Sequence, residues 1–362
     1  MTKFFEFFIL VMIDFQAIII KWYKNNKRQL PWRETKDPYR IWVSEIILQQ
    51  TRVKQGQNYY INFINIFPDI QTLANSSLDA LLKVWQGLGY YSRARNMHIA
   101  AKFIIENLNG KFPDNYEDLL KLKGIGEYTA AAIASISFNK SHAVLDGNVY
   151  RVLARIFGVK NNINTSTGKN EFKKLANELI SKKNPAEYNQ AIMEFGAVQC
   201  IPKNPLCINC PLLNSCYAHN NNLITQLPVK INRINIKKRY FYYLVIKQGD
   251  FIYLNKRTGK DIWNSLYEFP LIEMNNKVTD EEIIQSKKFN KLFEKSELII
   301  HKKSKYFKHI LTHQVIHAKY YLINLRLSSN NILKEYIKIP MNKLNDYPVP
   351  KLISLIIEDF NI

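Results

Sequence analysis

The sequence is poor in cysteine, and its few cysteines are not scattered. Only four occur among 362 residues, all between positions 200 and 216. Proteins that rely on disulfides distribute cysteines through the chain, so this arrangement favours a reducing compartment. The chain also lacks a small-residue cleavage site of the kind that ends a secretory signal, and it has no internal repeat of fixed period. We therefore expect a cytoplasmic protein.

No uninterrupted apolar run is long enough to span a membrane. Residues 4–20 are mostly apolar, but Glu6 and Asp14 interrupt them. A charged side chain at the centre of a bilayer costs about 2.5–3.5 kcal/mol, so we predict no membrane partner. We interpret residues 13–23 as a first helix instead. Met12 would serve as a start as well as Met1, so the first domain is taken from residue 12.

Acidic residues are outnumbered, with 30 Asp and Glu against 51 Lys and Arg and a net charge of +21. The excess is shared: residues 1–217 carry 27 basic and 17 acidic side chains, and the remainder carries 24 and 13. Such a chain suits a polyanion, because Lys and Arg release counterions from phosphates. On charge alone, a merely solvated basic surface stays an alternative. With 47% hydrophobic and 13% aromatic residues, a disordered chain is excluded.

The patterning of the chain changes near residue 218. Apolar residues at helical spacing predict helices over 13–23, 38–55, 78–85, 94–108, 117–122, 129–137 and 149–157. Residues 218–236 are predicted to be a polar linker. Aromatic and β-branched runs then predict strands over 239–246, 251–254 and 317–325, the first two joined as a hairpin. We expect an all-α domain over 12–217 followed by an α+β domain over 237–362.

The four cysteines form one motif, C-x6-C-x2-C-x5-C, made by Cys200, Cys207, Cys210 and Cys216. Four thiolates within 17 residues can surround one metal centre. The softness of the ligands allows a four-thiolate zinc site or a [4Fe-4S] cluster. The spacing by itself does not separate these two.

Two further motifs lie at predicted helix starts. Gly124 and Gly126 flank Ile125 ahead of a helix, where uncovered backbone N–H groups can bind a phosphate as in a helix–hairpin–helix. A lone pair of glycines is also common in plain turns. Asp146 precedes another helix, where it can cap the backbone. The same hydrogen bonds would keep its carboxylate ionised for chemistry.

These motifs occur in the order seen in the endonuclease III superfamily. They are joined by Pro31-Trp32-Arg33, Ser44-Glu45, Gln49-Gln50-Thr51 and Gly87-Leu88-Gly89-Tyr90-Tyr91. From about residue 14 to 217 the chain resembles that superfamily. The resemblance implies a helix–hairpin–helix DNA glycosylase domain whose loop 200–216 holds a [4Fe-4S] cluster rather than zinc.

Within the superfamily, the chain resembles the MutY family of adenine DNA glycosylases. Tyr128 stands where bifunctional members have a Lys nucleophile, which implies a monofunctional enzyme that uses water. Residues 257–270 resemble the opening of a MutT-like domain. That domain here lacks the carboxylate box of MutT-type hydrolases, so we predict no nucleotide hydrolysis.

The family's loop that probes 8-oxoguanine is matched by Leu311-Thr312-His313. Thr312 keeps the hydroxyl of the usual Ser, whereas Leu311 replaces an aromatic residue. Recognition of 8-oxoguanine is therefore expected to be retained. A buried core position is the alternative for His313.

The resemblance implies a role for each site residue. Glu45 would protonate adenine, an ionised Asp146 would stabilise the sugar cation, and Tyr128 and Asn148 would position the sugar and water. The apolar neighbours of Glu45 are expected to raise its pKa by desolvation. The expected DNA contacts are Arg33, Gln49, Gln50, Thr51, Leu88, Tyr90, Gly124, Gly126, Thr312 and His313.

The implied partner is double-stranded DNA with adenine opposite 8-oxoguanine or guanine, bound by a monomer at a bacterial-type nucleoid. Three other functions compete. They are a bifunctional glycosylase for oxidised pyrimidines, a zinc-containing DNA-binding protein without catalysis, and a nucleotide hydrolase. Tyr128 argues against the bifunctional glycosylase. The carboxyl groups of Glu45 and Asp146 argue against a DNA-binding protein without catalysis, and the missing carboxylate box argues against a nucleotide hydrolase.

Overall fold

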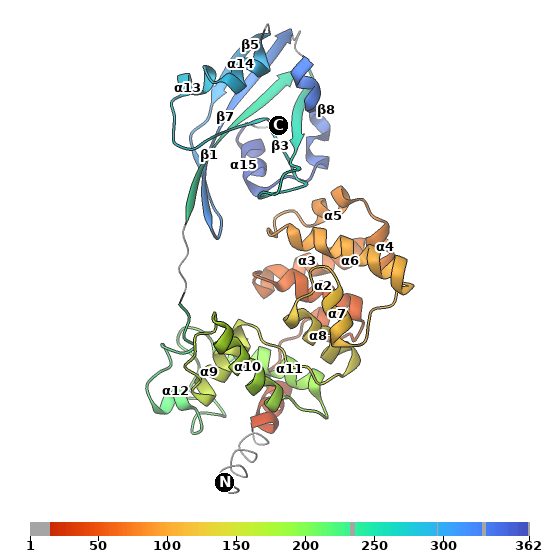
Figure 1. Ribbon diagram of the computed structural model, residues 1–362, viewed down its shortest axis with the longest axis vertical. Coiled ribbons are helices and arrows are strands. Elements are labelled where there is room, and N and C mark those ends of the chain that lie inside the picture. The colour runs from red at the N-terminus through yellow and green to blue at the C-terminus, as the bar shows by residue number, and fades with distance from the viewer. Residues whose placement is uncertain (1–14, 232–235, 295, 328–330, 361–362) are drawn as a thin grey trace. The chain divides into compact units, whose positions relative to one another are not determined.

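The computed structural model describes residues 15–231, 236–294, 296–327 and 331–360, and it forms two compact units (Figure 1). Unit 1 comprises Met1–Asn75 and Asn96–Asn232, and unit 2 comprises Ser76–Arg95 and Arg233–Ile362. A segment from the helical half of the sequence therefore belongs to unit 2. The domain limits at 217 and 237 stay a prediction, and the candidate start at Met12 lies outside the described residues.

The first half of the chain consists of helices, as predicted. Residues 15–26 are helical. The others are η1 (Pro31–Arg33), α2 (Pro38–Leu48), α3 (Val53–Ile66), α4 (Ile70–Asn75), α5 (Leu78–Val84), α6 (Ser92–Leu108), α7 (Tyr116–Lys121), α8 (Glu127–Phe138), α9 (Gly147–Phe157), α10 (Ser166–Leu179), α11 (Pro185–Val198) and α12 (Tyr217–Asn220).

One predicted helix was wrong. Residues 38–55 form two helices, because α2 ends at Leu48 and α3 begins at Val53. The cause lies in Gln50, whose φ of 56° is in the left-handed region and cannot continue a right-handed helix. The break puts Gln49, Gln50 and Thr51 in a turn, where their side chains line a cavity.

Helix α8 forms the centre of unit 1. Every residue from Thr129 to Ile136 is buried, as expected of a helix that is apolar all round. It packs against α2, α7 and α11, and α11 also packs against α9. The elements that carry the predicted catalytic residues therefore share one core.

Unit 2 is built around a mixed sheet. Its strands are β1 (Lys237–Gln248), β2 (Phe251–Lys256), β3 (Tyr267–Glu268), β4 (Leu271–Met274), β5 (Glu297–Lys303), β6 (Phe307–Ile310), β7 (Gln314–Leu327) and β8 (Ile337–Pro340). The path runs β3-β2-β1-β7-β5, with β1 and β7 parallel. The predicted hairpin is confirmed, because Gln248 pairs with Phe251 across the β1–β2 turn.

Alternate residues of β1 enter two separate cores. Phe241, Tyr243 and Val245 pack with α15 (Lys351–Asp359). Tyr242, Leu244 and Ile246 pack with α13 (Asp280–Ile284) and α14 (Lys287–Phe293). Because successive side chains of a strand point to opposite faces, helices cover both faces of the sheet. The remaining short helices are η2 (Asn331–Glu335) and η3 (Met341–Asp346).

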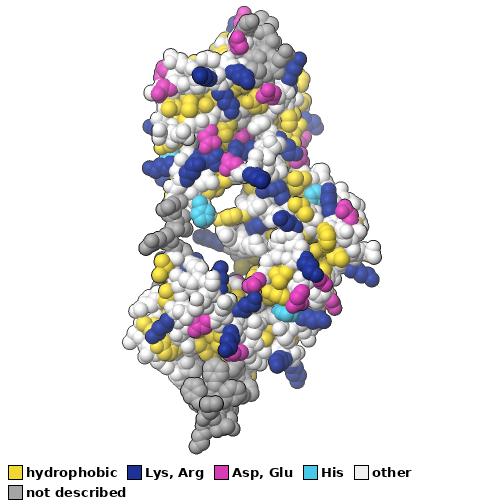
Figure 2. Space-filling model, viewed as in Figure 1, with side chains coloured by type: hydrophobic (Ala, Val, Ile, Leu, Met, Phe, Trp, Pro, Cys, Tyr) yellow, Lys and Arg dark blue, Asp and Glu magenta, His cyan; other side chains and the backbone are white. Residues whose placement is uncertain are grey.

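No helix in the described part of the chain is long and apolar enough to cross a membrane. On the face shown in Figure 2, Lys and Arg side chains are distributed over both units rather than gathered on one. This agrees with the even division of charge in the sequence.

Candidate active site

A cavity of about 510 Å³ in unit 1 brings together all four predicted catalytic residues and four of the ten predicted DNA contacts. Its volume is typical of small-molecule sites, which run from about 300 to 1,000 Å³. The predicted residues that line it are Glu45, Tyr128, Asp146, Asn148, Arg33, Gln49, Gln50 and Thr51. These come from the helices α2 and α8, from η1, from the turn after α2 and from the start of α9.

Glu45 is a buried acid on α2, with 7% of its surface exposed. Burial raises the pKa of its carboxyl group from 4.5 to about 7. A hydrogen bond from Tyr128 and the charge of Arg33 oppose this rise, while the charge of Asp146 adds to it. A large fraction of Glu45 therefore carries a proton at neutral pH.

Tyr128 connects α8 to this acid. Its hydroxyl donates to Glu45 Oε2 at 2.5 Å and lies 3.3 Å from Met193 Sδ. Burial, followed by the charges of Glu45 and Asp146, raises the pKa of the phenol well above 10, so it stays protonated. No lysine is among the described residues that line the cavity.

Asp146 caps the N-terminus of α9, as expected. Its Oδ1 accepts from the backbone N–H groups of Asn148 at 2.9 Å and Val149 at 2.8 Å. Its Oδ2 accepts from Asn148 Nδ2 at 2.7 Å. Burial raises the pKa of Asp146 above its ordinary value, and these three donors together with Arg151 offset only part of that rise. The three donors favour the ionised form, because each of them donates to a carboxylate oxygen.

Asn148 is held by a residue that the sequence did not indicate. Arg151 Nη2 donates to Asn148 Oδ1 at 2.9 Å and to the carbonyl oxygen of Gly196 at 2.7 Å. A Cβ on Gly196 would lie 2.7 Å from the Cβ of Asn148, so only glycine lets α11 approach this closely. The packing of α9 on α11 therefore orients the amide that contacts Asp146.

A buried charge cluster forms another wall of the cavity. Glu194 on α11 is 1% exposed and accepts from Arg28 Nε at 2.8 Å, Arg28 Nη2 at 2.6 Å and Arg33 Nη2 at 2.7 Å. Burial alone would raise the pKa of Glu194, but the two arginines lower it to about 2. Arg33, predicted as a DNA contact, is thus engaged by Glu194. The sequence did not indicate Arg28, which stands among polar residues, and the only signal for Glu194 is a charge within an apolar stretch.

The two-glycine turn joins α7 to α8, as the helix–hairpin–helix motif predicts. Gly124 has a φ of 84°, and a Cβ there would lie 2.6 Å from Asn96 Cβ. Gly126 is the N-cap of α8, has no side-chain cap, and has open space where a Cβ would point. Backbone donors at such a helix start suit a phosphate oxygen.

The other predicted DNA contacts belong to unit 2. Leu88 and Tyr90 lie in the loop before α6, and Thr312 and His313 lie in the tight turn between β6 and β7. Thr312 and His313 are both exposed, which excludes the core alternative for His313. The Tyr90 hydroxyl and Thr312 Oγ1 are 2.5 Å apart, so these two predicted contacts meet each other.

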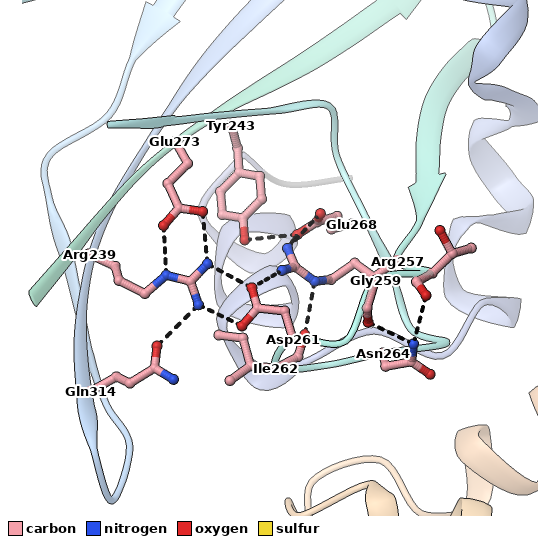
Figure 3. Close-up of polar contacts among 11 residues, drawn as sticks. Arg239, Tyr243, Arg257, Gly259, Asp261, Ile262, Asn264, Glu268, Glu273 and Gln314 are labelled. Atoms are coloured by element: carbon pink, nitrogen blue, oxygen red, sulfur yellow. Dashed lines mark hydrogen bonds and ion pairs between the residues drawn. The ribbon is translucent and has the colours of Figure 1, made fainter. Parts of the chain in front are cut away.

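A network of ion pairs lies at the base of that turn (Figure 3). Arg239 binds Glu273 and Asp261 and also donates to Gln314 Oε1 at 3.1 Å. Arg257 binds Asp261 and the buried Glu268, at 2.8 Å in each case. These carboxylates are therefore neutralised by arginine side chains.

The four cysteines line one small cavity beside Arg155. None of the four forms a disulfide, and Arg155 Nη1 lies 3.5 Å from Cys200 Sγ. Burial raises the pKa of Cys210 to about 11, and burial also raises those of Cys207 and Cys216. No three Cys, His, Asp or Glu side chains in the described ranges converge closely enough for a single metal ion.

Comparison with known proteins finds two matching family models. Residues 43–180 match the HhH-GPD superfamily of base excision DNA repair proteins, and residues 241–359 match the NUDIX domain. The chain is 36% identical over 349 residues to an adenine DNA glycosylase of Buchnera aphidicola subsp. Schizaphis graminum, covering 96% of this chain and 98% of that one. It is 40% identical over 213 residues to the human adenine DNA glycosylase, covering 56% of this chain and 39% of the human one.

Solved structures agree on the fold. A thermostable thymine-DNA glycosylase matches with a TM-score of 0.54 at 27% identity, over 58% of this chain and 97% of its own. An endonuclease III trapped covalently on DNA matches with a TM-score of 0.50 at 21% identity, over 57% and 95%. The second match supports the fold alone. The chain therefore belongs to the adenine DNA glycosylases of the helix–hairpin–helix superfamily, hydrolases that remove adenine from DNA in base excision repair.

Proposed function

We propose that this glycosylase hydrolyses the N-glycosidic bond of adenine paired with 8-oxoguanine or guanine, with Glu45 as the general acid and Asp146 as a stabilising anion. One observation carries the proposal. The two carboxyl groups face the same cavity, in surroundings that favour the protonated form of Glu45 and supply hydrogen-bond donors to Asp146.

The substrate base must first leave the double helix. Adenine in a duplex is out of reach of a buried acid, and flipping it out costs a few kcal/mol of stacking and pairing. Backbone N–H groups at the turn of Gly124 and Gly126 are suited to hold a phosphate of the distorted strand. Gln49, Gln50 and Thr51, which line the cavity, would contact the nucleotide that enters.

Bond cleavage then follows from the two protonation states. Glu45 donates its proton to the imidazole-ring nitrogen of adenine, and the electron pair of the N-glycosidic bond leaves with the base. Positive charge develops on the sugar, as in other glycoside hydrolyses. The Asp146 anion stabilises this cation electrostatically. Water adds to the anomeric carbon and loses a proton, so the products are free adenine and an abasic site.

A monofunctional reaction fits the absence of a lysine from the described lining of the cavity. Strand cleavage by a bifunctional enzyme needs an amine that forms a Schiff base with the sugar. Tyr128 has a phenol instead, and it is hydrogen-bonded to Glu45. Borohydride should therefore trap no covalent enzyme–DNA adduct, and a trapped adduct would reinstate the bifunctional alternative.

The direct test measures adenine release from duplexes with adenine opposite 8-oxoguanine, guanine, cytosine and thymine, with and without alkali to report strand cleavage. Glu45→Gln and Asp146→Asn should each lose excision by a factor on the order of 100 or more. Glu106→Gln, a change at an exposed acid on α6, is the matched control. A near-normal rate in either site variant removes that residue from the scheme.

Recognition of the opposite base is assigned to the turn of Thr312 and His313. Both side chains are exposed, and the hydroxyl of Thr312 can exchange its bond with Tyr90 for one to a base. Thr312→Val keeps the shape of the side chain and removes the hydroxyl. It should weaken binding to the 8-oxoguanine duplex more than to the guanine duplex. Equal losses would contradict a specific contact.

We also assign a [4Fe-4S] cluster to Cys200, Cys207, Cys210 and Cys216. The donor set fits, because four thiols face one cavity and their burial makes uncompensated thiolates unfavourable. When bound, the cluster would join the loop 200–216 to Arg155 on α9. Brown protein containing iron supports this assignment, whereas a colourless preparation containing zinc rejects it.

The proposal includes action as a monomer in a bacterial-type cytoplasm, associated with the nucleoid. Sedimentation of the purified protein tests whether it is a monomer.

We propose no nucleotide hydrolysis by the NUDIX domain, residues 241–359, because Asp261, Glu268 and Glu273 are all paired with arginines. Release of phosphate or diphosphate from nucleoside triphosphates would contradict this.

A further inference from the structure

One segment of the glycosylase sequence packs with the C-terminal domain. Ser76–Arg95 lies inside the part of the chain that matches the repair superfamily, yet it belongs to unit 2. The segment contains α5 and the loop Trp85–Tyr91, which carries the predicted DNA contacts Leu88 and Tyr90. Some set of interactions must hold it against the sheet.

Asp79, on the first turn of α5, contacts two strands of the sheet at once. Its Oδ1 lies 2.7 Å from Lys256 Nζ, and its Oδ2 accepts from the Tyr267 hydroxyl at 2.7 Å. Lys256 and Tyr267 are directly paired on strands β2 and β3, and the ammonium lies 5.0 Å from the centre of the tyrosine ring. One carboxylate thus joins two neighbouring strands to α5.

Two further residues extend this attachment along the segment. The side chain of Gln86 accepts from the backbone N–H of Val349 at 3.4 Å and donates to Ser354 Oγ at 3.3 Å. Arg95 Nη1 donates to the carbonyl oxygen of Asn264 at 2.7 Å. The segment is therefore attached before, within and after its loop.

The loop itself is stiff, so the position of α5 is transmitted to Tyr90. The guanidinium of Arg93 lies 5.2 Å from the Trp85 ring and 5.7 Å from the Tyr90 ring, and it donates to the carbonyl oxygen of Gly89 at 3.0 Å. Tyr90 has a φ of 47°, a conformation that a non-glycine residue keeps only when its surroundings impose it.

We infer that Asp79 is a positioning residue that attaches the Tyr90 loop to the C-terminal domain, so that Tyr90 and Thr312 meet the DNA as one rigid body. The inference rests on the proposed roles of Tyr90 and Thr312 in DNA recognition. It assigns the C-terminal domain a second task beyond its own contact with DNA, which is to hold part of the helical sequence in its binding conformation. Asp79 acts on binding and on the choice of the opposite base, and not on bond cleavage.

The ion pair alone would not justify this inference. Lys256 and Asp79 are each about one-third exposed (35% and 36%), and exposed pairs contribute only about 0–1 kcal/mol to stability. The argument depends on the second acceptor atom, which binds Tyr267, and on the stiffness of the loop. The effect of Asp79 on DNA binding therefore depends on the position of the Tyr90 loop and not on the net charge of the protein.

The test uses the full-length protein and a duplex whose adenine nucleotide resists cleavage. Asp79→Ala should raise Kd for the duplex with 8-oxoguanine by roughly 10-fold, equivalent to about 1.4 kcal/mol. Kd for the guanine duplex should rise less, and the excision rate at saturating enzyme should not change. Asp250→Ala removes the same charge from an exposed turn of unit 2 and should leave both Kd values unchanged.

Two further variants separate positioning from a structural defect. Lys256→Met removes the other partner of the same ion pair and should raise Kd in the same way. In a Tyr90→Ala background, Asp79→Ala should cause no additional loss, because Asp79 acts through Tyr90. A full additional loss there, or an unchanged Kd in the single variant, overturns the inference.

Hydrogen exchange measures the attachment of the loop and does not depend on the proposed function. The amide of Leu88 donates to the carbonyl oxygen of Trp85 at 3.1 Å, and residues 85–91 should exchange faster in Asp79→Ala but not in Asp250→Ala. Wild-type protein that releases no adenine would overturn the proposed function and leave this measurement intact. Unchanged exchange in Asp79→Ala would overturn the attachment itself.

Discussion

Replacing Glu45 by Gln should remove activity and, above neutral pH, add stability. The pKa of Glu45 is about 7 in the folded protein, against an ordinary value of 4.5, because the carboxyl group is buried. The acid works only when protonated, so wild-type excision at saturating enzyme should fall about tenfold for each pH unit above 7. A Gln amide has no proton to give, and the loss should be on the order of 100- to 10,000-fold.

The stability effect follows from the same pKa. A glutamate whose pKa is raised on folding binds its proton more tightly in the folded state, so stability falls as pH rises from 4.5 to about 7 and then stays reduced. Each pH unit in this window corresponds to about 1.4 kcal/mol, so ionising buried Glu45 costs about 3 kcal/mol. Gln avoids this cost but weakens the bond from Tyr128, which contributes about 1 kcal/mol. The net gain at pH 8 should be about 2 kcal/mol.

Denaturant unfolding of wild type and Glu45→Gln at pH 4.5 and pH 8 measures this difference. The variant should be more stable only at pH 8, because at pH 4.5 Glu45 is protonated in the folded state and about half protonated in the unfolded chain, so its ionisation costs little. Glu106→Gln, on an exposed face, should show no such dependence. Equal stability of wild type and Glu45→Gln at both pH values, or wild-type excision that does not change between pH 6 and pH 9, would refute the reasoning.

Three other predictions concern one hydrogen bond and one close packing contact in unit 1 and one ion pair in unit 2. Tyr128→Phe removes a hydrogen bond that lowers the pKa of Glu45, so the midpoint of the pH–rate profile should move to higher pH; a midpoint that stays or falls contradicts the assigned bond. Gly196→Ala places a Cβ 2.7 Å from Asn148 Cβ and should cost about 1–3 kcal/mol of stability, measured by denaturant unfolding, with a loss of excision. Arg257→Met leaves Glu268, 3% exposed, without its cation and should cost about 3 kcal/mol at pH 8; a thermal melt equal to wild type would show that the pair is dispensable.

Local motifs predicted most of the catalytic site, because each motif depends on interactions between residues that are close together in the chain. Asp146 caps α9 through the next three residues, and the glycine turn before α8 needs only its own backbone. Six predicted helices are present in the described residues, the first of them from residue 15 onward, and the strand pattern beyond residue 237 predicted the correct class of sheet. Helical period and strand period are properties of short stretches of sequence.

The predicted helix over 38–55 shows the limit of such patterns. Residues 49–52 are polar but include no glycine or proline, so nothing in the composition announces the left-handed turn that ends α2. As a consequence, the residues expected on a helix face are found instead on the wall of the cavity.

The sequence by itself determined the kind of chemistry, since the catalytic carboxyl groups, the thiols and the glycine turn are each marked by their neighbours in the chain. Only the tertiary structure decided the pKa values of these groups and the contacts that hold them in place. Glu194 meets Arg28 and Arg33 across more than 160 residues, Glu45 meets Tyr128 across 83, and Asp79 joins strands 177 and 188 residues away. Such pairings depend on packing between distant elements, and packing has no signature in the local order of residues.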